Sequence, residues 1–316
     1  MIYILKQKTK LSEFIFSGMD VAETIFYPPV RRNPFIHRIV KAIYYKMCDK
    51  IYLNFFPPET SAKLSAIKSE DTLIVVGEDI YTYWVVYNLC KHVKYKVAYF
   101  WNPKSTFERQ KCTRNILKSK NKAHEIVSYI RNLGYTMATF DYGDALAFNM
   151  RFFPQFYRFI ESTESKDMKY YFFFCGRDKG RKDTIEFYKE KLTPFGKCKF
   201  VVMSEGQTTD PIPYNEYVEY VKNSRVLCEA VQKNQIGLTV RSIEALFFNK
   251  KLITNNAEMK KYDIYVPNNV LIIDSSIRTR DIEDFLNKPM VKISDIIKKK
   301  YDVNTLAITL DRFARE

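Results

Sequence analysis

The sequence has few cysteines and histidines, and their spacing is not that of metal ligands. Six Cys and three His are scattered over 316 residues without a close pair, so neither a zinc site nor a disulfide framework is indicated. The Gly-x-Gly-x-x-Gly fingerprint of dinucleotide-binding proteins is also absent. Its absence argues against a dinucleotide-dependent oxidoreductase.

Long apolar runs are missing as well. No stretch approaches the roughly 20 apolar residues that a membrane-spanning helix needs. The first residues, Met1 to Lys10, place a short apolar run before Lys6, Lys8 and Lys10, which reverses the order of a secretory signal. We therefore expect a cytoplasmic protein that does not cross a bilayer.

The chain nevertheless has enough apolar side chains to build large cores. Apolar residues make up 46% of the sequence and aromatic residues 16%, with only 9 Gly and 12 Pro, which excludes global disorder. A length of 316 residues suits two domains of about 150 residues each.

The formal net charge of +15 predicts an anionic partner. The most basic region is 104–131, which contains eight Lys or Arg residues but only two acidic residues. Apolar residues recur in it at roughly helical spacing. One interpretation is that amphipathic helices here lie on the anionic inner face of a membrane. The alternative is an ordinary solvated helix face.

Strand-like and helix-like segments alternate along the whole sequence, which predicts parallel sheets covered by helices. In the first half we expect helices at Pro34–Cys48 and Tyr81–Lys91. The strands expected there are Glu13–Ser17, Ile51–Phe55, Thr72–Val76, Lys96–Phe100 and Thr136–Phe140.

A second series of elements begins after the aromatic and polar stretch 141–169. We expect an α/β fold of two Rossmann-like, doubly wound domains, 1–160 and 161–316, that face each other across a cleft where ligands bind. The strands expected in this half are Lys169–Cys175, Cys198–Met203, Arg225–Ala230, Lys251–Thr254 and Asn269–Ile273. The expected helices are Asp183–Leu192, Asn215–Asn223, Thr239–Phe248, Arg280–Leu286 and Asn304–Phe313.

A glycine-rich and basic loop follows the first strand of the second half. Gly176 and Gly180 allow close approach of a ligand to the backbone, and a helix N-terminus comes next. Arg177, Lys179 and Arg181 would repel one another unless an anion sits among them, and a diphosphate fits. The alternative is a solvated turn with its charges in water.

A second polar loop, from Gln232 to Thr239, follows the strand at Arg225–Ala230. Gly237 permits a tight turn, and Thr239 is a suitable N-cap for the next helix. Amides at this helix N-terminus would point toward a phosphate. Glu244, one turn in, lies where it could accept both hydroxyls of a ribose, or it could only balance charge in the first turn.

These two loops resemble the donor half of GT-B glycosyltransferases. More closely, Asp178–Arg181, Gln235–Leu246 and Lys250–Asn256 are similar to a family of bacterial lipopolysaccharide and capsule biosynthesis glycosyltransferases, as are Phe140–Ala145 and Tyr262–Asn269. The resemblance is specific from Thr139 to Ile273. It implies an N-terminal acceptor domain and a C-terminal donor domain. The implied donor-binding residues are Gly176, Arg177, Lys179, Arg181, Gln235, Gly237, Leu238, Thr239, Arg241 and Glu244.

The resemblance implies a sugar transfer from a UDP-, GDP- or dTDP-sugar to a lipid-linked or saccharide acceptor. Gln235 stands where the widespread retaining motif has a first glutamate, so the stereochemistry stays open. No Asp-x-Asp triplet is present, and basic residues can neutralise the leaving diphosphate in place of a metal ion. We therefore expect no metal and no other cofactor.

An inverting transfer needs a general base near the acceptor hydroxyl. Glu78 and Asp79 follow the apolar strand Thr72–Val76 and are the best-placed candidates, although they could simply cap the next helix. Asp20, Asp141 and Asp144 are further candidates.

The alternative from another class is a non-catalytic, basic nucleic-acid-binding protein that stacks bases on its 23 Tyr and 24 Phe. No recognition motif of the common nucleic-acid-binding folds is present, and the aromatic residues fall mainly in strand-like runs. We therefore expect no nucleic-acid partner.

Overall fold

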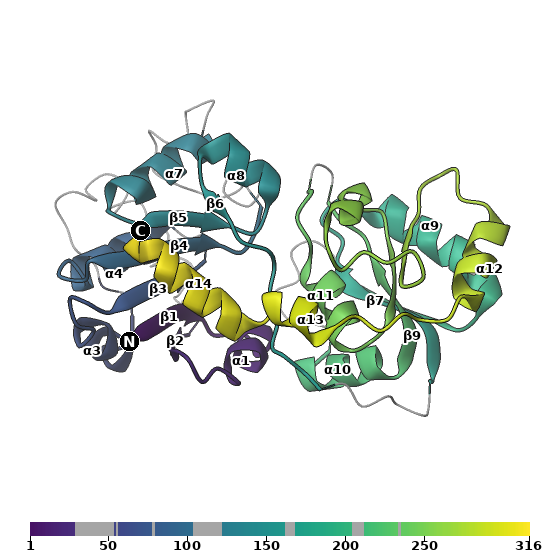
Figure 1. The fold of residues 1–316 in the computed structure, drawn as a ribbon, viewed down its shortest axis with the longest axis horizontal. Coiled ribbons are helices and arrows are strands. Elements are labelled where there is room, and N and C mark those ends of the chain that lie inside the picture. The colour runs from purple at the N-terminus through teal and green to yellow at the C-terminus, as the bar shows by residue number, and fades with distance from the viewer. Residues whose placement is uncertain are drawn as a thin grey trace, which may run out of the picture. The chain divides into compact units, whose positions relative to one another are not determined.

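The computed structural model of the chain describes residues 1–28, 54, 56–77, 80–103, 122–161, 168–203, 212–232 and 235–316. They form two compact units, the first comprising Met1–Pro154 with Val303–Glu316 and the second Gln155–Asp302. Each unit contains one parallel sheet with helices packed on it (Figure 1). The predicted α/β class with two parallel sheets is confirmed.

The first sheet has the strand order β2-β1-β3-β4-β5-β6, and every neighbouring pair runs parallel. All five residues of β3 are buried, as expected for a parallel strand covered on both faces. The strands are β1 (Ile2–Gln7), β2 (Glu23–Tyr27), β3 (Thr72–Val76), β4 (Tyr95–Phe100), β5 (Thr136–Thr139) and β6 (Arg151–Phe152).

The helices of the first unit include one from the far end of the chain. In α14, Val303, Leu306, Ala307 and Leu310 form a buried stripe at helical spacing, and this helix packs against β1, β3 and β4 (Figure 1). The helices are α1 (Lys10–Phe16), α3 (Pro58–Ser65), α4 (Ile80–Leu89), α7 (Lys122–Asn132), α8 (Tyr142–Phe148) and α14 (Val303–Arg315).

The strand predicted at Glu13–Ser17 is wrong, because these residues lie in or next to helix α1. A capping box starts this helix: the Thr9 hydroxyl accepts from the Ser12 amide at 3.1 Å, and the Ser12 hydroxyl accepts from the Thr9 amide at 2.8 Å. A short apolar run fits either a strand or a helix, and here the cap decides. The helix predicted at Pro34–Cys48 and nearly all of the strand predicted at Ile51–Phe55 lie outside the described residues.

The second sheet has the order β11-β10-β9-β7-β8 and is again parallel in every pair. Its strands are β7 (Tyr170–Arg177), β8 (Cys198–Met203), β9 (Ser224–Glu229), β10 (Lys251–Thr254) and β11 (Val270–Ile272). The helices of this unit are α9 (Lys182–Leu192), η1 (Thr193–Phe195), α10 (Tyr214–Lys222), α11 (Val240–Phe247), η2 (Ala257–Lys261), α12 (Thr279–Asn287) and α13 (Asp295–Lys300).

Both sheets follow the same doubly wound plan. Counted from its own first strand, each sheet begins with the order 2-1-3-4-5. In this plan successive strands are added on opposite sides of the first strand, so the strand order reverses between the first and third strands, and ligands bind at the carboxyl ends of the strands at that switch point. In the second unit the switch point lies between β7 and β9.

The units differ from the predicted domains, 1–160 and 161–316, in two segments. Residues 155–160 belong to the second unit, and Val303–Glu316 belong to the first. The last helix follows the second sheet in the sequence, but its apolar stripe packs on the first sheet.

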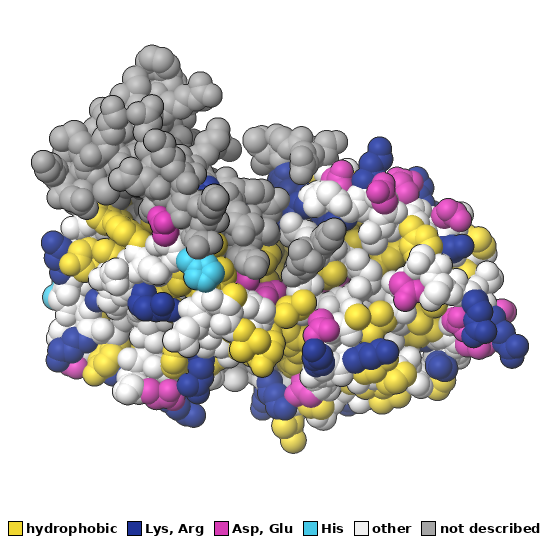
Figure 2. Space-filling model, turned by 90° about the horizontal axis from the view of Figure 1, so that it is seen from above, with side chains coloured by type: hydrophobic (Ala, Val, Ile, Leu, Met, Phe, Trp, Pro, Cys, Tyr) yellow, Lys and Arg dark blue, Asp and Glu magenta, His cyan; other side chains and the backbone are white. Residues whose placement is uncertain are grey.

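Surface charge is spread out on the face shown in Figure 2, where Lys and Arg are interspersed with Asp and Glu. Of the basic region 104–131, residues 104–121 lie outside the described residues. The remainder forms α7, which buries Ala123, Ile126, Val127 and Ile130 and is amphipathic as predicted. None of the described helices is long and apolar enough to cross a bilayer.

Candidate functional site

The candidate site lies at the carboxyl ends of β7 and β9, at the switch point of the second sheet. The loop after β7 turns sharply because Lys179 (φ 48°) and Gly180 (φ 75°) both adopt left-handed backbone conformations. Glycine takes this conformation without strain, whereas Lys179 is held in it at a cost. Helix α9 then starts at Lys182.

Arg181 holds this loop in place. Its guanidinium donates to the carbonyls of Arg177 and Ala230, and to the carbonyl of Asp178 at 3.0 Å. Arg177 ends β7 and Ala230 follows β9, so this side chain joins the two strands at the switch point. Burial, and then the nearby charge of Arg241, lower the pKa of Arg181.

Arg241 joins the start of α11 to β7. Its Nη2 donates to the carbonyl of Cys175 at 2.6 Å, and its guanidinium lies over the rings of Phe173 and Tyr217, at 5.5 and 5.0 Å. The side chain is only 12% exposed, and its Nε and Nη1 are buried without a hydrogen-bond acceptor. Arg241 is thus a buried cation with spare donors.

Glu244 is the nearest carboxylate to Arg241, with 3.5 Å between its Oε2 and the arginine Nε. Tyr214 donates to Oε1 at 3.2 Å, and Tyr217 donates to Oε2. The side chain is 2% exposed, so no carboxylate oxygen is available to a ribose in this structure. Burial raises the pKa of Glu244, while Arg241 and the tyrosine hydroxyls oppose that rise.

Glu229, at the end of β9, was not predicted as a site residue. Its carboxylate accepts from the hydroxyls of Thr239 and Ser242, both at 2.5 Å, and of Thr254 at 2.6 Å. Thr239 also accepts from the Arg241 amide at 3.0 Å, so Glu229 fixes the N-cap of α11. The available signal was an acidic residue inside the apolar run 226–231, because a buried carboxylate needs partners.

We call Arg181, Glu229, Arg241 and Glu244 the charged cluster. It contains two cations and two carboxylates, which come from the loop before α9, the end of β9 and helix α11. Because each member contacts several neighbouring groups, the cluster gives this edge a fixed shape rather than a set of mobile charges.

Two asparagines after β10 fasten the remaining loops. Asn255 accepts from the Val231 amide at 2.8 Å, and Asn256 donates to the carbonyl of Gly237 at 3.4 Å. Gly237 and Leu238 are buried. The backbone amide of Gln235 donates to the carbonyl of Gln232 at 3.0 Å. The two predicted loops are thus brought to the same sheet edge.

The predicted donor-binding residues differ in exposure and in the contacts of their side chains. Lys179 is exposed and Arg177 is half-buried, as are Gly176, Gln235 and Thr239. Four other side chains make contacts inside the second unit: Arg181, Arg241, Leu238 and Glu244. Of the ten predicted residues, Lys179 alone is exposed.

The electrostatics of this edge favour an anion. From the end of β7 to the first turn of α9, four cations, Arg177, Lys179, Arg181 and Lys182, outnumber two acids, Asp178 and Asp183, and the helix dipole adds positive potential. Among the described residues, no three His, Cys, Asp or Glu side chains gather as metal ligands.

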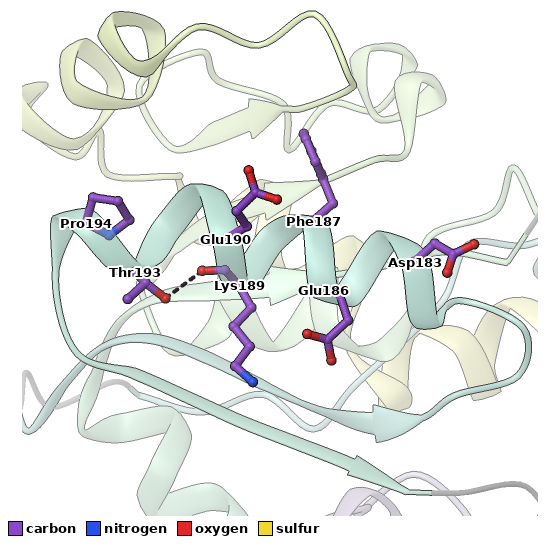
Figure 3. A pocket seen from close by; sticks show the side chains of 7 residues that line it. All are labelled: Asp183, Glu186, Phe187, Lys189, Glu190, Thr193 and Pro194. Atoms are coloured by element: carbon purple, nitrogen blue, oxygen red, sulfur yellow. Dashed lines mark hydrogen bonds between the residues drawn. The ribbon is translucent and has the colours of Figure 1, made fainter.

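A surface depression on the outer side of α9 does not share this chemistry. Figure 3 shows its lining residues along the helix and the following turn, with the Thr193 hydroxyl bonded to the Lys189 carbonyl. Three of them are acids, Asp183, Glu186 and Glu190, against the single cation Lys189. This balance is unsuited to a diphosphate.

The predicted bases Glu78 and Asp79 lie outside the described residues. They follow β3, which borders the switch point of the first sheet. Asp141 is buried and caps α8 by accepting from the Asp144 amide at 3.1 Å. Asp20 is exposed, and its amide donates to the side chain of Asn304 at 3.2 Å.

No protein-family model and no curated protein sequence matches the chain. Two crystal structures are similar at low identity. AviGT4, a glycosyltransferase involved in avilamycin A biosynthesis, aligns over 99% of this chain and 96% of its own with 8% identity and a TM-score of 0.43. TarM aligns over 81% of this chain with 14% identity and a TM-score of 0.38, and this chain spans about half of TarM, 54%.

Proposed function

We propose that the chain is a glycosyltransferase of the GT-B type that takes a sugar from a nucleoside-diphosphate donor at the second sheet. The observation that carries this proposal is the loop Gly176–Arg181: a basic, sharply turned loop at the switch point between β7 and β9, adjoining the N-terminus of α11. The sequence resemblance described above supports the same activity.

In this proposal Arg177 and Lys179 bind the donor diphosphate, and the N-terminus of α9 adds backbone donors. Positive groups at this position stabilise the negative charge that develops on the leaving nucleoside diphosphate. They do so as the bond between the anomeric carbon and the phosphate oxygen breaks.

The charged cluster has a supporting role here. Arg181 fixes the loop that carries Arg177 and Lys179, and Glu229 fixes the cap of α11. Because Glu244 is buried among Tyr214, Tyr217 and Arg241, it acts through Arg241 rather than on the ribose. Gln235, Gly237 and Thr239 shape the loop that faces the donor.

For the acceptor we propose a lipid-linked or saccharide hydroxyl in bacterial lipopolysaccharide or capsule biosynthesis, at the inner face of the cytoplasmic membrane. In an inverting transfer the acceptor oxygen attacks the anomeric carbon, and Glu78 or Asp79 takes the hydroxyl proton. The basic region 104–131 is the proposed membrane contact. No metal takes part in this scheme.

A substrate panel tests the activity. UDP-, GDP- and dTDP-sugars are incubated with the protein, with CMP-sugars as the monophosphate comparison, and release of nucleotide is followed. We expect hydrolysis or calorimetric binding for at least one diphosphate sugar. Binding to none of them, together with steeply salt-dependent binding to unrelated oligonucleotides, would favour the nucleic-acid alternative.

Two substitutions test the site. Arg177→Ala and Lys179→Asn each remove one cation, and asparagine tolerates the left-handed backbone at 179. Each is expected to weaken binding of the donor about tenfold or more, since a charged hydrogen bond contributes about 1.5–3 kcal/mol. The control is Lys189→Gln, in the depression on α9, which should leave binding unchanged. Equal affinities for all four proteins would exclude the assignment.

A further inference from the structure

The chain passes between the two units twice, once after Pro154 and once after Asp302. On the second unit these two passages are paired with each other. The Tyr157 amide donates to the carbonyl of Tyr301 at 2.9 Å, Tyr157 and Asp302 form a parallel bridge, and the Phe159 amide donates to Asp302 Oδ1 at 3.1 Å. A displacement of either passage therefore acts on the other.

The ring of Tyr157 fastens this pair to helix α11. It is fully buried and contacts Phe247, with 6.1 Å between ring centroids in a stacked arrangement, and Phe248 at 6.3 Å. Phe247 is the last residue of α11, and Phe248 follows it. The passages thus pack on the far end of the helix whose N-terminus faces the proposed donor site.

The hydroxyl of Tyr157 continues the connection toward that N-terminus. It lies 2.5 Å from the hydroxyl of Tyr214, which donates to Glu244 Oε1 at 3.2 Å. Glu244 in turn pairs with Arg241, whose amide is held by the N-cap Thr239. Tyr157 and Glu244 are buried, and Tyr214, Arg241 and Thr239 are partly buried, so these hydrogen bonds are costly to lose.

We propose that Tyr157 is a positioning residue that couples the two passages between the units to the N-terminus of α11, so that anion binding at the donor site and the conformation of the passages depend on each other. This inference rests on the proposed function, since it concerns the same site. Coupling of this kind is reciprocal: whatever the passages do to the affinity of the site, the bound anion does to the passages.

A hydrogen-exchange experiment on the full chain tests the coupling, with inorganic pyrophosphate as the probe. In the unsubstituted protein, pyrophosphate should slow exchange at the amides of Tyr157, Phe159 and Val240–Ser242. In Tyr157→Phe, which keeps the ring and removes the hydroxyl, protection should remain at Val240–Ser242 and disappear at the passages. The affinity for pyrophosphate should fall about fivefold or more.

Two further variants make the result specific. Tyr214→Phe removes the next hydroxyl without substituting a residue of the passages, and it should produce the same loss of distant protection. Tyr135→Phe is the matched control, because it removes an equally buried hydroxyl, donating to the Tyr83 carbonyl at 2.9 Å, in the first unit. Unchanged protection at the passages in both Tyr157→Phe and Tyr214→Phe would overturn the proposal.

A measurement without any ligand separates this inference from the proposed function. In the absence of pyrophosphate, Tyr157→Phe should speed exchange at Val240–Ser242, and Tyr135→Phe should not. If pyrophosphate does not bind the unsubstituted protein, the proposed donor site is wrong, but the ligand-free measurement still shows whether Tyr157 is coupled to the N-terminus of α11. Identical exchange at Val240–Ser242 in Tyr157→Phe and Tyr135→Phe would mean that it is not coupled.

Discussion

The two sheets share a strand order, but two groups of charged contacts, one in each unit, lie at opposite edges of their sheets. In the first unit two ion pairs lie where strands begin: the Met1 amine lies 2.6 Å from Asp71, and Arg315 pairs with Asp311 at 2.8 Å beside Thr72. In the second unit the charged cluster lies where strands end. One edge fastens a helix to the sheet, whereas the other shapes loops that can receive a ligand.

This difference shows how a common scaffold separates stability from binding. The contacts of Thr72, Asp311 and Arg315 connect α14 to the strands it covers, so removing them should affect only folding. The charged cluster both supports its own unit and orients the proposed donor loop. Substitutions at the two edges should therefore give different combinations of lost stability and lost binding.

The largest effect is expected for Arg241→Met. The substitution leaves Glu244 buried without its cation, and breaking a buried pair in this way costs about 3–5 kcal/mol. Denaturant unfolding, followed by a probe in the second unit, measures the loss. Arg278→Met, which breaks the exposed pair with Asp281, should cost less than about 1 kcal/mol. Similar losses in the free energy of unfolding for Arg241→Met and Arg278→Met would show that the charged cluster contributes no more to stability than a surface ion pair.

An intermediate effect is expected for Lys251→Met at the amino edge of the second sheet. The Lys251 ammonium donates to the carbonyls of Phe285 and Lys288, both at 2.6 Å, and of Leu286 at 3.2 Å, at the end of α12. Losing these donors should cost about 1–3 kcal/mol in the free energy of unfolding. The result shows whether contacts at the amino edge of this sheet also stabilise the packing of a helix on it, here α12.

The same residue gives a pH test. Burial, with Arg225 and Lys288 nearby, lowers the pKa of Lys251 to about 8, below its ordinary value of 10.5. Between these values the unfolded chain holds a proton that the folded chain has released, so stability from this group rises with pH. The stability difference between the unsubstituted protein and Lys251→Met should widen from pH 7 to pH 10. A difference that narrows over this range contradicts the assignment.

The smallest effect is expected for Thr72→Val in the first unit. The Thr72 hydroxyl donates to Asp311 at 2.5 Å and accepts from Arg315 at 3.0 Å, and valine keeps its shape. Because Asp311 and Arg315 still pair with each other, the loss should be about 1 kcal/mol. Thermal unfolding measures it, and pyrophosphate binding should not change. A loss of binding would show that the amino edge also serves the site.

Much of the fold could be predicted from the sequence where strands are short apolar runs bounded by turns. The segment Cys198–Met203 was predicted with the bounds of β8, and Lys251–Thr254 with those of β10. The run at Ile2–Gln7 was not recognised as a strand, because Lys6 interrupts it. In the structure Lys6 is 9% exposed and lies 4.4 Å from the ring centroid of Trp101.

The sequence predicted that the two loops lie at one sheet edge, but not which of their side chains are buried. Strand-end glycines and cations indicated that edge, because it follows from local spacing. Which cations are buried depends on contacts such as Arg181 with Ala230, 49 positions apart in the sequence. The same applies to Glu244, whose tyrosine partners come from α10.

The return of α14 to the first sheet has a consequence for synthesis of the protein. Residues 155–302 hold all the strands and helices of the second unit, so that unit has its full sequence before Val303 leaves the ribosome. The first core, in contrast, lacks Leu306 and Leu310 until the whole second unit has been translated. The domain that is translated first is thus completed last, and its uncovered sheet face is the surface that nascent-chain chaperones would have to shield.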